Sequence, residues 1–535
     1  MHILASSLIV IAAGAAALLA HPATSITLQP VGNYRTGVFA DGATEIIAFD
    51  GFTKRLFSVN GHTGAVDVLS LRNPSRPTLL FSIDLARYGK SANSVAICNG
   101  LLAVAVENND KQAPGRVLLF RTWGKCPLLN NLEIGALPDM ITFTPNGRYV
   151  LTANEGEPSD DYSNDPEGSV SIIDLRHGPL AATVATASFS SFNDRKEELL
   201  AKGVRIYGPN ASVAQDFEPE YIAVSHDSRT AWVTLQENNA LAVISIRYAT
   251  VTDIVPLGYK DHLDPYNKFD ASDKDDMIYL NTWPVYGMYL PDAIASFHVF
   301  GRDYLITANE GDARDYDGYS EESRVKDLKL DPIAFPQWEN LQEKQNLGRL
   351  KVTTSQGDID QDGEFEQLYC YGGRSFSILD ETGAPVYESG SLLEEITAGY
   401  YPDDFNSDND ENDSKDGRSD DKGPEPEGIA IGKVFNNTYA FIGLERIGGI
   451  MTFNVSNPAA PSFVDYVNTR DFSGDPETDG AGDLAPEGII FVPPQQSPNF
   501  KPLVIAGYEV SGSITVFEVV PQCRLGHHDH RAYHR

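Results

Sequence analysis

The stretch PDMITFTPNGRYVLTANEGEP, from Pro138 to Pro158, contains two short runs joined by Pro-Asn-Gly. Apolar and polar residues alternate in both runs, which is typical of β-strands, and Pro-Asn-Gly is typical of a tight turn. A second stretch, PDAIASFHVFGRDYLITANEGDA from Pro291 to Ala313, repeats the pattern and again reaches Thr-Ala-Asn-Glu-Gly. The sequence therefore contains at least two copies of one structural unit.

The same unit occurs seven times along the chain. Its first runs begin at Glu45, Asn93, Pro138, Pro219, Pro291, Pro426 and Pro486. The second runs end at Asn60, Glu107, Glu155, Glu237, Glu310, Glu445 and Glu509. A third run usually follows a glycine, and a weaker fourth run often follows that. Repeats of four short antiparallel strands are typical of a β-propeller, so we predict an all-β fold with seven blades. The segment 312–373 could be an insertion or a further blade, so eight blades is the alternative.

The last copy lacks a fourth strand, whereas ITLQPVGNYRTG, from Ile26 to Gly37, is a strand-like run without a unit of its own. We expect this N-terminal strand to complete the last blade, because closing the ring removes exposed strand edges. The prediction is one propeller domain over 26–520. Its insertions are expected at 191–216, 259–289, 312–373, 390–424 and 471–484.

Composition and the two ends of the chain limit where the protein works. The 535 residues carry a formal net charge of −34, which disfavours nucleic acid and anionic membranes as partners and favours divalent cations. The first 20 residues contain no Lys, Arg, Asp or Glu and are mostly apolar, so 1–20 is predicted to be a secretory signal peptide. No other apolar run is long enough to span a membrane. We expect a secreted monomer with a His-rich tail at 521–535.

Four Cys residues are too few for a disulfide-dense scaffold, and they are spaced too widely for a zinc site built from Cys. In an oxidising compartment one or two disulfides are expected, and Cys98 with Cys126 is the favoured pair because both lie in one repeat. Glycosylation sequons occur at Asn210, Asn412, Asn436 and Asn454, so the chain is a glycoprotein wherever its host glycosylates.

The repeat gathers acidic residues on one face. In a propeller the first strand lines the central channel, and the chain enters this strand and leaves the second strand on the same face. The expected channel-mouth acids are Asp139, Glu220, Asp292, Glu427 and Glu487, with Glu107, Glu155, Glu237, Glu310, Glu445 and Glu509 beside them. Crowded carboxylates either bind cations or have raised pKa values. The equal alternative is that each Glu accepts backbone N–H bonds from the next loop.

The strongest metal motif is DIDQDGEFE, from Asp358 to Glu366. Acidic residues occupy positions 1, 3, 5 and 9, and Gly363 occupies position 6. This is the front half of a Ca²⁺-binding loop, in which Asp358, Asp360, Asp362 and Glu366 supply carboxylates and Glu364 supplies its carbonyl. Tyr369 at position 12 rules out a complete EF-hand. A solvated acidic turn is the alternative.

Catalytic motifs are missing from the sequence. It contains no G-x-S-x-G, HExxH or phosphate-binding loop. Arg446 adjoins Glu445, and together with Glu155 and Glu310 it could support phosphoester hydrolysis by metal-activated water. The same groups could bind a mineral surface or an anionic glycan through Ca²⁺. Each Arg is more often a structural ion-pair partner than a catalytic group.

Several motifs together resemble one known family. They include GALPDMITFTPNGRYVLTANEGEPSDDY, SVAQDFEPEYIAVS, TANEGDARDYDGYSEESRVKDL, NDENDSKDGRSDDKGPEPEG and AFIGLERIGGIM. This set resembles the choice-of-anchor I family, which includes mesenchyme-specific cell-surface glycoprotein-like proteins of biomineralising cells. The resemblance covers nearly the whole mature chain. It implies a YVTN/WD-like propeller and an extracellular or cell-surface location.

We therefore expect a secreted, acidic, Ca²⁺-binding propeller that acts by binding. Its expected partner is an extracellular matrix component, a mineral surface or another protein, with a role in biomineralisation or surface adhesion. Some bacterial relatives in the family are tied to alkaline phosphatase activity. The alternative is therefore a metal-dependent phosphoesterase, using Ca²⁺ or another divalent metal at the acidic mouth.

Overall fold

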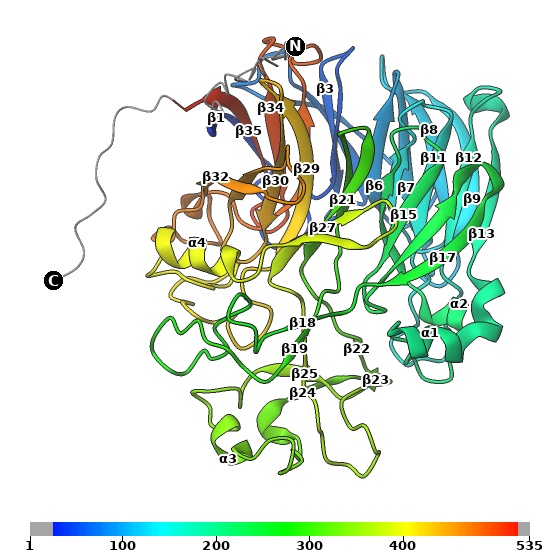
Figure 1. Ribbon diagram of the computed structural model, residues 1–535. Coiled ribbons are helices and arrows are strands. Elements are labelled where there is room, and N and C mark those ends of the chain that lie inside the picture. Colours follow the sequence, from blue (N-terminus) through cyan, green and yellow to red (C-terminus); the bar gives the residue numbers. More distant parts are fainter. Residues whose placement is uncertain (1–24, 523–535) are drawn as a thin grey trace, which may run out of the picture.

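A computed structural model describes residues 25–522 of the chain (Figure 1). The expected signal peptide, Cys523 and all but the first two residues of the His-rich tail lie outside the described part. Within it, most residues belong to seven four-stranded antiparallel sheets, and helices are few and short. The prediction of an all-β fold of the propeller type is therefore confirmed.

The first four sheets each use four consecutive strands. They are β2–β5 (Ile47–Asp50, Arg55–Asn60, Ala65–Ser70, Thr78–Ile83), β6–β9 (Ala92–Cys98, Leu101–Val106, Pro114–Arg121, Leu128–Ala136), β10–β13 (Pro138–Phe143, Tyr149–Asn154, Ser169–Asp174, Thr183–Ser188) and β14–β17 (Pro219–Val224, Thr230–Leu235, Ala240–Ser245, Thr250–Pro256). In each sheet the strands pair in chain order, as repeated antiparallel units should.

The other three sheets include one with an insertion and one that joins the two ends of the chain. They are β20, β21, β27 and β28 (Ile294–Val299, Arg302–Asn309, Ser375–Asp380, Pro385–Glu388), β29–β32 (Pro426–Val434, Asn437–Leu444, Ile450–Asn454, Ser462–Val467) and β33–β35 with β1 (Pro486–Val492, Leu503–Tyr508, Ser513–Pro521, Ile26–Arg35). In the last sheet, Ile26 of β1 lies opposite Pro521 of β35.

Two insertions combine into a separate sheet. Its strands are β18 (Tyr259–Asp261), β19 (Tyr286–Met288), β26 (Tyr369–Tyr371), β25 (Lys351–Thr353) and β24 (Glu322–Arg324), in that order. A small hairpin, β22 (Asp315–Tyr316) with β23 (Tyr319–Ser320), lies in the same insertion. The segment 312–373 thus adds strands to a five-stranded sheet and does not form a further four-stranded unit. Figure 1 shows these elements at one end of the propeller-type sheets.

The helices lie in the insertions. The α-helices are α1 (Lys196–Lys202), α2 (Val213–Asp216), α3 (Trp338–Leu341) and α4 (Leu392–Tyr400). Short 3₁₀ turns are η1 (Pro179–Ala181), η2 (Ser190–Arg195), η3 (Ile246–Tyr248), η4 (Val325–Asp327) and η5 (Asp479–Ala481). Within residues 25–522, no helix is both long and apolar enough to cross a membrane.

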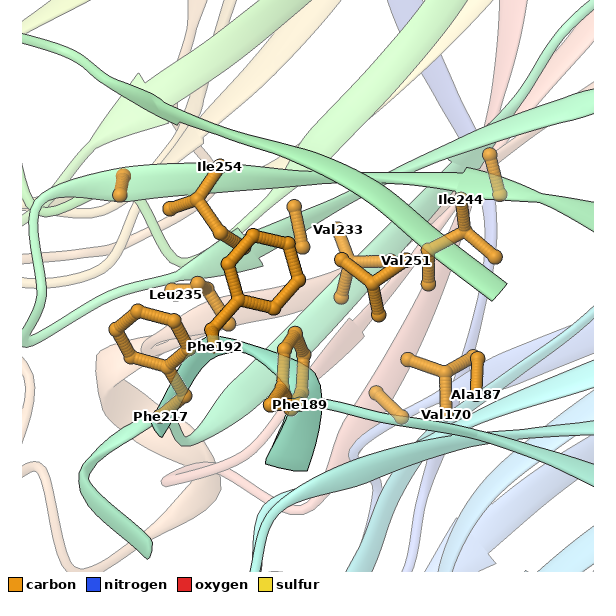
Figure 2. Close-up of a cluster of buried hydrophobic side chains, with 14 of the residues drawn as sticks. Val170, Ala187, Phe189, Phe192, Phe217, Val233, Leu235, Ile244, Val251 and Ile254 are labelled. Carbon is orange, nitrogen blue, oxygen red and sulfur yellow. The ribbon is translucent and has the colours of Figure 1, made fainter. Parts of the chain in front are cut away.

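Apolar side chains fill the space between neighbouring sheets. Figure 2 shows one such layer, where Val170 of β12 and Val233 of β15 lie with Phe189 and Phe217 from the connecting segment. The two Phe rings meet edge to face, with centroids 5.4 Å apart. Each fully buried side chain of this kind stabilises the fold by about 1.5–3 kcal/mol. Because both faces of a middle strand are covered, these strands are nearly continuous apolar runs.

The repeated Thr-x-Asn at the ends of β11 and β21 forms the same buried network in two sheets. Asn154 Nδ2 donates to Ser169 Oγ (3.2 Å) and Ser171 Oγ (3.0 Å), and Thr152 Oγ1 donates to Asn154 Oδ1 (3.0 Å). The equivalent bonds in the other sheet join Thr307, Asn309, Ser375 and Ser377. Both Asn side chains are fully buried, so the network satisfies polar groups that burial would otherwise leave unpaired.

The prediction of a disulfide between Cys98 and Cys126 is wrong. Cys98, Cys126 and Cys370 are free thiols. Cys98 Sγ lies near Gly147 of the third sheet, whereas Cys126 Sγ lies 3.8 Å from Arg55 Nη1 of the first sheet. The two sulfur atoms belong to one sheet but lie toward different neighbouring sheets, so membership of one repeat did not bring them together.

Candidate functional site

An acidic cavity of about 770 Å³ lies where the first strands of the sheets begin. Seven of the expected mouth acids line it: Glu107, Asp139, Glu220, Asp292, Glu427, Glu487 and Glu509. Asp41 and Glu45 also line it, while Lys90 and His62 are its basic residues. Lys90 pairs with Glu107 (3.1 Å), and His62 pairs with Asp41 (2.5 Å). The charged groups in the wall of the cavity are therefore mostly carboxylates.

Sequence reasoning placed Glu45 at the start of a strand but did not count it among the mouth acids. The signal was present, since Glu45 occupies the position of Asp139 and Glu220 in its own repeat. Burial raises the pKa of Glu45 to about 8, and the charges of Glu509, Asp139 and Glu107 add to the shift. Its carboxyl group is therefore largely protonated at neutral pH unless a cation approaches.

Three carboxylates meet between the third and fourth sheets. Oxygen atoms of Asp139, Glu155 and Glu220 all lie within 4.8 Å of one another. Burial and the charge of Glu157 raise the pKa of Asp139 to about 7. Burial also raises the pKa values of Glu155 and Glu220 well above their usual range. The charge of Glu155 adds to the shift of Glu220, and the hydrogen bond between them raises the pKa of Glu220 and lowers that of Glu155.

No Lys or Arg in the described chain forms an ion pair with this trio; Lys111 pairs with Glu157 instead. Within residues 25–522 the trio therefore has no direct ion pair, although Lys111 is near enough for the charge of Glu155 to help raise its pKa. Their oxygen atoms are the hard ligands that Ca²⁺, Mg²⁺ or Mn²⁺ prefer.

A second acidic group contains Glu310, Glu425 and Glu445, with oxygen atoms within 4.8 Å of one another. In this group, Lys and Arg side chains of the chain itself form ion pairs with the carboxylates. Lys422 Nζ lies 2.8 Å from Glu310 and 3.1 Å from Glu425. Burial alone would raise the pKa of Glu425, but Lys422, together with Arg418 and Arg446, lowers it to about 2.

This second group changes the role of Arg446, which the sequence offered as a catalytic candidate. Its Nε lies 3.1 Å from Glu425 and 3.3 Å from Glu445, so the guanidinium is already held by two carboxylates. The structure therefore separates the catalytic candidates: Glu155 lies in the trio, while Glu310, Glu445 and Arg446 belong to the ion-pair network. Sequence reasoning missed Glu425, although Glu-Pro-Glu occurs both at 218–220 and at 425–427.

Glu237 is the mouth acid that neither lines the cavity nor belongs to one of the two carboxylate groups above. It is buried, and its Oε2 has no hydrogen-bond partner. Burial raises its pKa to about 8, with Asp312 adding to the shift and Arg314 opposing it. Arg314 itself is buried and pairs with Asp216 and Glu218.

The loop DIDQDGEFE brings its carboxylates together. Ligand atoms of Asp358, Asp360, Asp362 and Glu366 lie within 4.8 Å of one another on an exposed loop. Gly363 has a φ of +91°, which a residue with a side chain rarely adopts, and its N–H donates to Asp358 Oδ2 (3.0 Å). The side chain of Glu364 does not join the group, since it pairs with Lys329 (2.5 Å).

The sheets and the acidic mouth together define an all-β, propeller-type protein with a carboxylate-lined cavity on the face that carries its insertions. The sequence model of the choice-of-anchor I domain matches residues 45–458. The chain belongs to the choice-of-anchor I family, as its motifs indicated.

Two curated relatives support this assignment. The chain is 35% identical over 184 residues to Gigasin-3a of Magallana gigas, an alignment that covers 32% of this chain and 64% of that protein. It is 26% identical over 320 residues to the mesenchyme-specific cell surface glycoprotein of Strongylocentrotus purpuratus, an alignment that covers 52% of this chain and 41% of that protein. The chain thus spans less than two thirds of each of these relatives. Among solved structures, Kuenenia stuttgartiensis hydrazine synthase aligns with a TM-score of 0.47 at 11% identity, covering 91% of this chain and 100% of that one.

Proposed function

We propose that this protein is an extracellular, Ca²⁺-binding β-propeller that acts by binding other molecules at a surface or in a matrix. Its family, a relative named as a cell surface glycoprotein and an apolar N-terminal segment without charged residues support this location. The partner is a matrix component, a mineral surface or another protein. Carboxylates held on a rigid face suit each of these, because bound Ca²⁺ can bridge them to an anionic surface.

The proposal includes a ring of seven blades. The first strands of successive sheets are in contact from β2 through β6, β10, β14, β20 and β29 to β33, and β33 contacts β2 again. The pairing of β1 with β35 gives the last sheet its fourth strand. This arrangement supports a closed ring, with the insertions carried on one face.

The observation that carries Ca²⁺ binding is the carboxylate group of the loop Asp358–Glu366. Three aspartates alternate with other residues, Glu366 follows four positions later, and the four carboxylates converge. The glycine between Asp362 and Glu366 has the backbone conformation that the turn requires. Ca²⁺ prefers such flexible sets of oxygen ligands. A bound ion would also hold the loop in place beside β26, the strand of the five-stranded sheet that follows the loop in the chain.

Calorimetric titration with Ca²⁺ tests this site. The double variant Asp360→Asn/Asp362→Asn should lose one Ca²⁺ or bind it about tenfold or more weakly, because two charged ligands are removed. Glu339→Gln, an acid of the same insertion outside the loop, is the matched control and should bind normally. Unchanged stoichiometry and affinity in the double variant would contradict a Ca²⁺ site in this loop.

The trio Asp139, Glu155 and Glu220 favours a second candidate function, metal-dependent phosphoester hydrolysis at the mouth. Its carboxylates form no ion pair with a described Lys or Arg, and Asp139 and Glu220 line a cavity large enough for a small substrate. The test is turnover of a phosphomonoester with Ca²⁺, Mg²⁺, Mn²⁺ or Zn²⁺. Activity that Glu155→Gln abolishes and the exposed control Glu133→Gln retains would establish an enzyme. No turnover with any of the four ions would leave binding as the function.

A further inference from the structure

The face opposite the acidic mouth has the reverse charge. The sheet connectivity places there the connections from first to second strands and from third to fourth strands, which we call the turn face. Among the described residues, these connections contain nine basic and two acidic residues. The basic ones are Lys54, Arg72, Arg76, Lys125, Arg148, Arg176, Arg229, Arg247 and Lys501, and the acidic ones are Asp227 and Glu381. These connections are thus net basic in a chain with a net charge of −34, although Asp50, Asp174 and Asp380 end strands that lead into them and Asp174 pairs with Arg176.

Exposed Phe side chains accompany these charges. Phe52, Phe300, Phe435 and Phe500 are 84%, 77%, 50% and 80% exposed. Each lies in the connection between the first and second strands of its sheet, and the four sheets are neighbours, because β20 contacts β29, β29 contacts β33 and β33 contacts β2. A basic residue lies within two positions of every one of them: Lys54, Arg302, Lys433 and Lys501. Four aromatic tips and four cations therefore follow one arc of the turn face.

The backbone at three of these Phe residues is unfavourable for a bulky side chain. Phe300, Phe435 and Phe500 have φ values of +53°, +47° and +60°. The tight turn of the second sheet has Asn99-Gly100 where the fifth and sixth sheets have Phe300-Gly301 and Phe435-Asn436. Asn-Gly is the favoured pair in such turns, and Phe at a positive φ is rare. Turn geometry does not account for Phe at these positions, so exposure to a partner is the better explanation.

We propose that the turn face docks on a lipid bilayer that contains anionic phospholipids. The four Phe side chains enter the headgroup region, and the neighbouring Lys and Arg side chains contact phosphate groups. An acidic polymer would need the cations but would gain little from aromatic tips on separate turns, whereas the apolar part of a bilayer stabilises each of them. The acidic mouth does not cancel this attraction, because salt screens charges beyond about 10 Å. The inference goes beyond the proposed function, since it concerns the opposite face and needs no Ca²⁺.

Vesicle flotation tests the proposal with the chain produced in a bacterial host. That host avoids a glycan at Asn436, whose sequon adjoins Phe435. Vesicles of phosphatidylcholine alone are compared with vesicles of two parts phosphatidylcholine to one part phosphatidylserine. A chelator is present throughout, so that Ca²⁺ cannot bridge the acidic mouth to the lipid. The chain should float with the anionic vesicles only and should dissociate at high salt.

The variant Phe52→Ser/Phe300→Asn/Phe435→Asn/Phe500→Asn should partition on the order of a hundredfold less, because each lost contact is worth a factor of several. Asn suits the positive φ, so the melting temperature should stay the same or rise. The control Leu263→Ser/Met277→Ser/Ile333→Ser removes exposed apolar side chains from the insertions and should bind like the parent.

Three outcomes would overturn the proposal: no vesicle binding, equal binding to both kinds of vesicle, or full binding by the four-Phe variant. Binding to soluble polyglutamate without vesicle binding would assign the face to an acidic polymer instead.

Discussion

Asn154 and Asn309 occupy the same place in two sheets, and each donates to two serines of the next strand. We expect Asn154→Ala to lower the free energy of unfolding by about 1–3 kcal/mol, because buried hydroxyl groups lose their partner. Denaturant titration measures the change, and the exposed Asn131→Ala should shift it by less than about 0.5 kcal/mol. Equal effects from the two variants would show that the buried network contributes nothing.

Arg314 is fully buried between Asp216 and Glu218, and it connects the insertion that contains β22 to the segment before β14. Arg314→Met should destabilise the protein by about 3–5 kcal/mol, since it leaves buried carboxylates without a cation. The double variant Arg314→Met/Glu218→Gln should recover part of this loss. A double variant as unstable as the single one would mean that packing, not charge, explains the cost.

The pairing of β1 with β35 places the two ends of the described chain together. The N–H of Gln522 donates to the carbonyl of Ser25 (2.7 Å). A permuted chain that joins these residues by a short linker and opens at the exposed turn Gly124–Lys125 should therefore fold. Its melting temperature should equal or exceed that of the parent, because β1 becomes covalently continuous with its sheet. Insoluble or unfolded protein would show that β1 must be a free end. A chain permuted within the buried strand β34 is the negative control and should not fold.

The elements predicted from the sequence are those with a local signal. Alternating apolar residues identified the first three strands of nearly every sheet, and positions such as Pro138–Phe143 were correct to the residue. β13 was missed because half of its residues, TVATAS, are Thr or Ser and the strand lies on an outer edge of its sheet. The five-stranded sheet was missed because β19 and β26 come from different insertions and pair in parallel, which no local pattern encodes.

The acidic mouth was predictable because one repeat rule places every copy on the same face of the molecule. That rule could not distinguish Glu155, which forms no direct ion pair in the described chain, from Glu310, which pairs with Lys422. Lys422 is 112 positions away in the sequence and reaches Glu310 only through the insertion before β29. The turn face was not predicted either, because net charge averages over both faces and hides their difference.

The mouth should make metal-free stability depend on pH in two directions. Burial raises the pKa of Glu45 from 4.5 to about 8 and that of Asp139 from 3.8 to about 7. Between these limits the folded chain holds more protons than the unfolded chain, so stability should fall as the pH rises from about 5 to about 8. Burial alone would raise the pKa of Glu425, but Lys422, Arg418 and Arg446 lower it from 4.5 to about 2. The stability that Glu425 contributes is therefore lost as the pH falls below about 4.5.

The melting temperature in chelator should therefore be highest near pH 5. Adding Mg²⁺ or Ca²⁺ at pH 8 should recover the loss on the alkaline side, because a divalent ion replaces the protons that the crowded carboxylates share. The variant Glu45→Gln/Asp139→Asn should flatten this alkaline side and weaken the response to metal, while its acid side stays unchanged. The loop variant Asp360→Asn/Asp362→Asn should keep the full alkaline slope. A melting temperature that rises steadily from pH 5 to pH 8 in chelator would mean that the mouth carboxylates are ionised and already neutralised by groups within the chain.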